Sequence, residues 1–168
     1  MRAEVPQIRP KRMCHVLLFT TDVDRAIQFY TQVLGLRLTD RGGHAIAFLH
    51  GIHGSDHHML AVALSPAPGF HHASWGVDSI NEVGLGDMQM AARGSNAGWG
   101  SLRHVLGSNF SHCGRAPWGS YFESTCDIDH IHKDCDWHAG HYDPEDPPYL
   151  WAHAPPPCFS IPSHNEPD

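Results

Sequence analysis

A strand-like apolar run followed by a helical pattern occurs twice in this chain, about 57 residues apart. In the first copy His15 lies near the start of the run, and Asp22 follows seven residues later at the position of a helix N-cap. In the second copy His72 and Ser79 have the same spacing. We interpret the pattern as a degenerate internal repeat, which favours a fold of two similar halves. A pseudo-twofold arrangement of the halves would bring the two histidines together at its axis.

Short apolar runs between glycine-rich segments complete each copy. The first copy has strand-length runs at 36–40, 45–50 and 59–64, and the second has runs near 107–113 and 120–126. The sequence therefore predicts an α+β fold of two βαβββ modules, at about 13–66 and 69–129.

The chain is long enough for one domain with flanking segments, at 168 residues. Residues 1–12 contain two prolines and four Lys/Arg residues, and we expect them to form an irregular N-terminal arm. The folded domain is expected at 13–130. Residues 131–168 are rich in proline and histidine and show neither helical nor strand period, which predicts an extended C-terminal segment. Tyr149–Trp151 is its candidate apolar anchor, and the last dozen residues are expected to be disordered.

Composition argues against several classes of protein. The net charge of -7 disfavours a nucleic-acid partner, because proteins that bind phosphate backbones present a basic face. No apolar run approaches the roughly 18 to 20 residues that cross a bilayer, so we expect no membrane span. The basic N-terminus lacks the apolar stretch of a secretory signal, which favours the cytoplasm. Five cysteines without a Cys-x-x-Cys pair indicate neither a zinc ribbon nor a disulfide framework.

Histidine is unusually frequent, with sixteen copies. Most are expected to be ordinary packed or surface residues, because a metal site uses only a few of them. The matching positions of His15 and His72 favour these two as metal ligands. Alternation along a strand places His71 and His72 on opposite faces, so only one of this pair is expected to face a shared site, and the alternation does not say which.

Glu123 follows apolar residues in a predicted strand, where an unpaired carboxylate is costly if it faces the core. The alternative is a solvated strand face. Two histidines and one carboxylate form the usual ligand set of non-haem Fe(II) oxygenases. His58 and His104 have ordinary explanations as well, as a loop-end residue and a surface residue.

In their order and spacing, these segments resemble the catalytic domain of the type I extradiol ring-cleavage dioxygenases, which belong to the vicinal oxygen chelate superfamily. The resemblance runs from about Cys14 to Asp129. It is carried by HVLLFTTDVDRAIQFYTQVLGL, FLHG with SDHHMLAVAL, GFHHASW, RHVLGSN with PWGSYFE, and CDID. The segment DPEDPPYLW also resembles the C-terminal extension of some members.

The resemblance implies two modules whose curved sheet surrounds a central metal. It implies that His15, His72 and Glu123 bind Fe(II), with Mn(II) as the alternative ion, and that the substrates are a catechol-like aromatic and O2. His58 matches the acid–base histidine of the family, and His104 matches a histidine that hydrogen-bonds the substrate side of the pocket. We also expect a homo-oligomer.

The chain departs from the family pattern at several positions. Cys113 stands where the family has a catalytic tyrosine that hydrogen-bonds the bound catecholate, and a thiol is a weak donor. Ala116 replaces a common aspartate, Ser101-Leu102 replaces a glycine, and we do not expect the N-terminal module that many members carry. The alternatives are therefore a weakly active or inactive member that binds a metal or small molecule, or a glyoxalase-like metalloenzyme. His58 distinguishes them, because only ring cleavage gives it a task.

Overall fold

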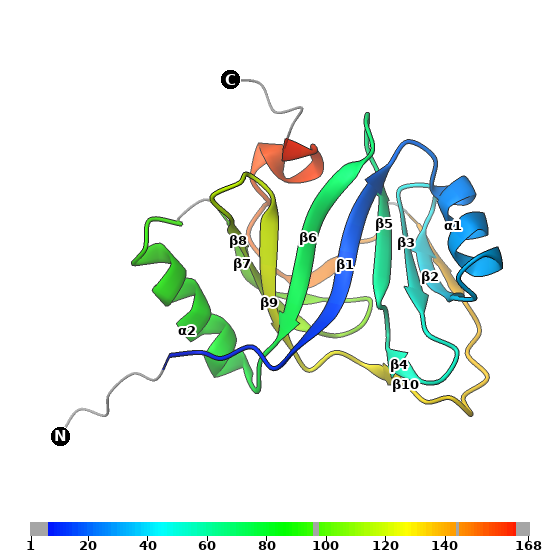
Figure 1. Ribbon diagram of the computed structural model, residues 1–168, viewed down its shortest axis with the longest axis horizontal. Coiled ribbons are helices and arrows are strands. Elements are labelled where there is room, and N and C mark those ends of the chain that lie inside the picture. Colours follow the sequence, from blue (N-terminus) through cyan, green and yellow to red (C-terminus); the bar gives the residue numbers. More distant parts are fainter. Residues whose placement is uncertain (1–6, 96–97, 144, 164–168) are drawn as a thin grey trace.

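The computed structural model describes residues 7–95, 98–143 and 145–163 (Figure 1). The first module consists of β1 (Arg12–Thr20), α1 (Val23–Gln32), β2 (Arg37–Gly42), β3 (Ile46–His50), β4 (Ser55–Asp56) and β5 (Leu60–Leu64). The second consists of β6 (Gly69–Gly76), α2 (Ile80–Ala91), β7 (Trp99–His104), β8 (Phe110–Arg115) and β9 (Tyr121–Cys126). The predicted α+β fold of two βαβββ modules is confirmed. The sequence pattern did not single out β7, in which Gly100 and Ser101 interrupt the apolar residues.

Both predicted helix starts are present. The side chain of Asp22 accepts a hydrogen bond of 2.9 Å from the backbone N–H of Arg25, and the side chain of Ser79 accepts one of 3.4 Å from Glu82. Each bond satisfies one of the backbone donors that a first helical turn leaves free. The two caps fix where the chain turns from the central strands into the helices.

Replacing Asp22 with alanine is expected to lower the free energy of unfolding by about 1 kcal/mol, because the cap hydrogen bond is lost. Urea denaturation followed by circular dichroism measures this change. Asp22→Asn keeps an acceptor at the same place and serves as the control. Equal stability of the alanine and asparagine variants would show that the cap contributes nothing.

The segment after residue 131 packs along both edges of the sheet. β11 (Gly140–Tyr142) pairs with β2, and β12 (Tyr149–Trp151) pairs with β7. Within β12, Tyr149 packs against Trp99 of the second module. The short helix η1 (Pro157–Ser160) follows, so the prediction that the last dozen residues are disordered is wrong for residues 157–163. Residues 164–168, like residues 1–6 of the predicted N-terminal arm, lie outside the described chain.

Within the described residues, one sheet of ten strands has the order β11-β2-β3-β5-β1-β6-β9-β8-β7-β12. Its centre is the antiparallel pair β1 and β6, which joins the modules. Each of these strands has a parallel partner on its outer side, β5 beside β1 and β9 beside β6. A separate two-stranded sheet pairs β4 with β10 (His130–Ile131). The pairing is symmetrical between the modules, and it places His15 and His72 on the two central strands.

A β-bulge at His71 changes the direction of the side chains around it. The successive residues Leu17 and Leu18 of β1 pair with His72 and Phe70 of β6, so β6 has one extra residue. The bulge breaks the alternation, and the rings of His71 and His72 touch, with their Nδ1 atoms 2.6 Å apart. The prediction that they lie on opposite faces is therefore wrong. Bulges often redirect a side chain beside a functional site.

Each module has its own apolar core. The buried residues of the first are Val23, Ala47, Leu49, Leu60 and Val62. In the second module one cluster contains Trp99, Leu102, Cys113 and Tyr121, and another contains Val77, Val83 and Cys126. Figure 1 shows α1 and α2 at opposite ends of the sheet, which leaves its middle to the histidine-bearing strands. None of the helices in the described part of the chain has the length and apolarity that crossing a membrane requires.

Candidate metal centre

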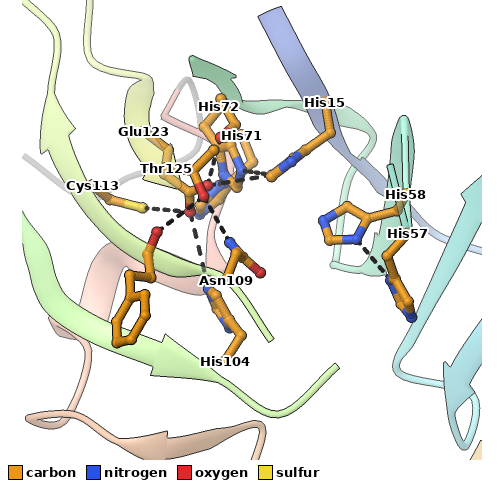
Figure 2. A network of polar contacts seen from close by, with 12 residues as sticks. His15, His57, His58, His71, His72, His104, Asn109, Cys113, Glu123 and Thr125 are labelled. Atoms are coloured by element: carbon orange, nitrogen blue, oxygen red, sulfur yellow. Dashed lines mark hydrogen bonds and ion pairs between the residues drawn. The ribbon is translucent and has the colours of Figure 1, made fainter. Parts of the chain in front are cut away.

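Three of the predicted site residues meet where the two modules join (Figure 2). His15 comes from β1, His72 from β6 and Glu123 from β9, and one ligand atom of each lies within 4.8 Å of the others. Nε2 of His15 is 3.1 Å from Nε2 of His72 and 3.5 Å from Oε1 of Glu123. All three side chains are buried. The ring nitrogens and the carboxylate therefore converge on one small volume.

The electrostatics of this group fit a divalent cation. Burial raises the pKa of Glu123 to about 7, although a hydrogen bond from Ser74 opposes the shift. Burial lowers the pKa of both His15 and His72 well below its usual value, and neighbouring histidines add to the effect. Two neutral imidazoles and a carboxylate then share the site, and the described residues give the carboxylate no Lys or Arg partner. A metal ion would supply that charge, and this donor set suits Fe(II) or Mn(II).

Glu123 is held by two side chains of the neighbouring strands. The hydroxyl of Ser74 donates to Oε1 at 2.6 Å, and the thiol of Cys113 donates to Oε2 at 3.5 Å. Cys113 lies directly opposite Glu123 in the pairing of β8 with β9. Burial raises the pKa of Cys113 well above its usual value, so the group remains a thiol. Cys113 thus touches the candidate ligand carboxylate.

His71 contacts the His72 ring and fixes its orientation. Nε2 of His71 lies 2.7 Å from the carbonyl oxygen of Phe159 in η1, which can only accept, so this nitrogen carries the proton. Burial lowers the pKa of His71 to about 4, which keeps the ring neutral. Its Nδ1 is then an acceptor for Nδ1–H of His72. The lone pair of His72 is left on Nε2, the nitrogen that faces His15 and the proposed metal.

His58 and His104 lie beside the group without belonging to the three converging ligands. The rings of His58 and His15 have centroids 4.3 Å apart, and burial lowers the pKa of His58 well below its usual value. Nε2 of His104 is 4.0 Å from Oε2 of Glu123, and this side chain is 24% exposed. His104 is therefore partly exposed and lies beside Glu123, and its role in the site stays a prediction.

The structure brings all the predicted site residues into one neighbourhood: His15, His58, His72, His104, Cys113 and Glu123 (Figure 2). The sequence did not identify the hydroxyl of Ser74 or the backbone carbonyl of Phe159 as partners. It also did not identify Asp40, whose Oδ2 lies 2.7 Å from Nε2 of His57. A local signal existed for the histidine partners, because His57-His58 and His71-His72 repeat the same dipeptide. In both pairs the first ring contacts the second through Nδ1.

Known proteins share this arrangement of modules. The family model of the glyoxalase/bleomycin resistance protein/dioxygenase superfamily matches residues 12–124. Metapyrocatechase 2 of Cupriavidus necator is 50% identical over 152 residues, which cover 90% of this chain and 48% of that protein.

Two solved structures are also similar. The Mn(II)-bound glyoxalase from Novosphingobium aromaticivorans superposes with a TM-score of 0.80 at 24% identity, over 91% of this chain and 50% of that one. The 2,2',3-trihydroxybiphenyl 1,2-dioxygenase from Sphingomonas wittichii superposes with a TM-score of 0.74 at 26% identity, over 86% of this chain and 50% of that one.

The chain spans about half the length of these relatives. At 24% identity, the likeness to the glyoxalase concerns the fold alone. The resemblance inferred from the sequence is confirmed by the family model and by the identity to Metapyrocatechase 2. The chain belongs to the glyoxalase/bleomycin resistance protein/dioxygenase superfamily.

Proposed function

We infer that this chain is the catalytic part of an Fe(II)-dependent extradiol dioxygenase, which opens a catechol-like ring next to its two hydroxyl groups. The observation that carries this proposal is the convergence of the buried side chains of His15, His72 and Glu123 where the two modules join, with no Lys or Arg partner among the described residues. The names of two relatives, Metapyrocatechase 2 and a trihydroxybiphenyl dioxygenase, support the reaction class. The same nitrogen and oxygen donors also suit Mn(II), which is the alternative ion.

His15, His72 and Glu123 would hold the ion. A bound divalent ion of this kind supplies the Lewis-acid and redox chemistry that joins a catechol to O2. The remaining work falls to the side chains around the ligands. Ser74 and Cys113 orient the Glu123 carboxylate, and their hydrogen bonds limit how far it can turn.

His58 is placed to move protons. Burial lowers its pKa, so the ring is neutral at neutral pH and can accept a proton from a substrate hydroxyl. Its ring lies beside that of His15, one of the three residues that would hold the metal. His104 approaches Glu123 from β7 and is placed to hydrogen-bond the substrate. Ring cleavage requires both proton transfer and a hydrogen bond to the substrate, whereas simple metal binding requires neither.

The proposal includes O2 and a small aromatic diol as partners, and no nucleic acid. The homo-oligomer and the cytoplasmic location stay predictions of the sequence.

Anaerobic reconstitution with Fe(II), followed by a panel of catechols and then air, tests the proposed function. The expected result is a yellow ring-opened product that forms only with iron, catechol and O2 together. Mn(II) in place of Fe(II) tests the alternative ion. No product across a broad panel, with iron shown to be bound by elemental analysis, would contradict the proposal and favour a binding protein.

Replacing Cys113 with tyrosine is expected to raise turnover about 10-fold or more. The phenol is a stronger hydrogen-bond donor than the thiol, and its partner would be the bound catecholate, which is charged. A hydrogen bond to a charged partner contributes about 1.5 to 3 kcal/mol. Because Cys113 is only 1% exposed, the larger ring is also expected to lower the free energy of unfolding by about 1 to 3 kcal/mol. Steady-state kinetics and urea denaturation measure the two effects separately.

Cys113→Ser is the control, since a hydroxyl keeps a small donor beside Glu123. We expect its turnover to stay near that of the wild type. A fall in turnover for both variants, with iron retained, would contradict the prediction and give the thiol itself a role.

A further inference from the structure

A series of hydrogen bonds leads from His58 to the buried carboxylate of Asp40. Nδ1 of His58 is 3.0 Å from Nδ1 of His57, and Nε2 of His57 is 2.7 Å from Oδ2 of Asp40. None of the three residues is more than 4% exposed. Asp40, His57 and His58 therefore form one continuous hydrogen-bonded chain inside the protein.

The carboxylate sets the direction of these bonds. A carboxylate only accepts, so Nε2–H of His57 donates to Asp40. In the neutral form of His57, which carries this one proton, Nδ1 is left as an acceptor for Nδ1–H of His58. The lone pair of His58 is then on Nε2. Figure 2 shows this nitrogen on the side of the ring that faces Glu123 and His72.

We propose that Asp40 and His57 are positioning residues that fix the ring orientation and the tautomer of His58, so that a proton acceptor faces the substrate. This inference rests on the proposed function, in which His58 moves protons. The logic is that of other histidines whose second nitrogen is bonded to a carboxylate, which holds the ring and favours one tautomer. Here a second imidazole lies between the carboxylate and the working ring.

The C-terminal segment holds Asp40 in place. The N–H of Gly140 donates to Oδ1 of Asp40 at 2.7 Å, so both carboxylate oxygens have partners. Nε1–H of Trp137 donates to the backbone oxygen of Thr39 at 2.9 Å, and its ring packs edge-on against His57 with centroids 5.7 Å apart. A Cβ at position 140 would lie 2.6 Å from Oδ1 of Asp40, so an added side chain would have to displace the carboxylate. This anchoring keeps the carboxylate directed at His57.

Asp40→Asn tests the proposal with little change of shape. The amide oxygen can still accept from Gly140, but its NH2 then faces Nε2 of His57, which must become an acceptor. The proton of His57 moves to Nδ1 and that of His58 moves to Nε2. Because partners of this kind are typically worth 10- to 100-fold in activity, we expect kcat to fall by about 10- to 100-fold. KM and bound iron are expected to stay near the wild-type values.

The tautomer is read directly by NMR of the full chain with 15N-labelled histidine. In the wild type, Nε2 of His58 is expected to give the signal of a bare nitrogen, and in Asp40→Asn that of a protonated one. Asp56→Asn is the matched control, because Asp56 is also buried but pairs with Arg12, at 2.6 Å, outside this chain of contacts. It is expected to lower stability without changing kcat or the His58 signal.

A second pair of variants keeps the test decisive if Asp40→Asn does not fold. Gly140→Ala crowds the Asp40 carboxylate and is expected to lower kcat with iron retained. Gly84→Ala, where the added Cβ meets nothing within 4 Å, is its control. A proton on Nε2 of wild-type His58 would overturn the proposal. The proposal would also be overturned if kcat of Asp40→Asn fell no more than kcat of Asp56→Asn. The same holds if the fall in kcat were matched by an equal loss of iron.

The tautomer measurement does not depend on turnover. If the wild type cleaved no catechol while His58 showed the expected tautomer and its change in Asp40→Asn, the proposed function would fail and the positioning of His58 would stand.

Discussion

Alanine in place of His15, His72 or Glu123 is expected to lower the affinity for Fe(II) by about 100-fold or more. Even the outer hydrogen-bond partners of metal ligands are worth about 10- to 100-fold in affinity, and a direct ligand contributes more. Anaerobic titration with Fe(II), and iron analysis after gel filtration, measure the loss. A variant that binds iron as tightly as the wild type would show that the replaced residue is not a ligand.

His112→Ala is the matched control. His112 is a buried histidine on β8, and its Nε2 lies 3.1 Å from Oδ1 of Asp87, away from the centre. We expect this variant to bind iron like the wild type. His71 is unsuitable as a control, because its ring contacts His72 and fixes the orientation of that ligand.

The melting temperature gives a second test of whether Glu123 is a metal ligand. In the metal-free protein this carboxylate is buried without a cation, and its pKa is raised to about 7, so at higher pH its charge opposes folding. Glu123→Gln is therefore expected to leave the melting temperature of the metal-free chain unchanged or higher. The rise in melting temperature on adding Fe(II) should disappear, because a ligand stabilises only the state that binds it.

Replacing His58 with glutamine is expected to lower kcat by about 100- to 10,000-fold, the usual contribution of a positioned acid–base group. The three ligands remain, so iron content should not change. Stopped-flow kinetics on the iron-loaded variant measures the effect. Wild-type turnover would remove His58 from the mechanism, whereas loss of iron would make it a ligand.

The fold followed from the sequence wherever the pattern was local. The caps at Asp22 and Ser79 and most of the strands depend on neighbouring residues, and they lie where the periodicity places them. The C-terminal segment is different. Its strands have three residues each and form by pairing with β2 and β7, which lie far away in sequence, so no periodicity is long enough to reveal them.

The site was predictable to the extent that it repeats. His15 and His72 are equivalent in the two modules, and this equivalence pointed to both. The bulge at His71 was not predictable, since it depends on how β6 pairs with β1. Asp40 and Phe159 carry no local signal either, because they contact His57 and His71 from 17 and 88 residues away.

The product formed from a catechol under 18O-labelled O2 tests the central claim most directly. The iron-loaded chain is mixed with an unlabelled catechol, and mass spectrometry with NMR identifies the product. We predict a ring opened next to the diol, with both atoms of one O2 molecule incorporated. Unchanged catechol, or a ring opened between the two hydroxyl-bearing carbons, with iron shown to be bound, would contradict the account.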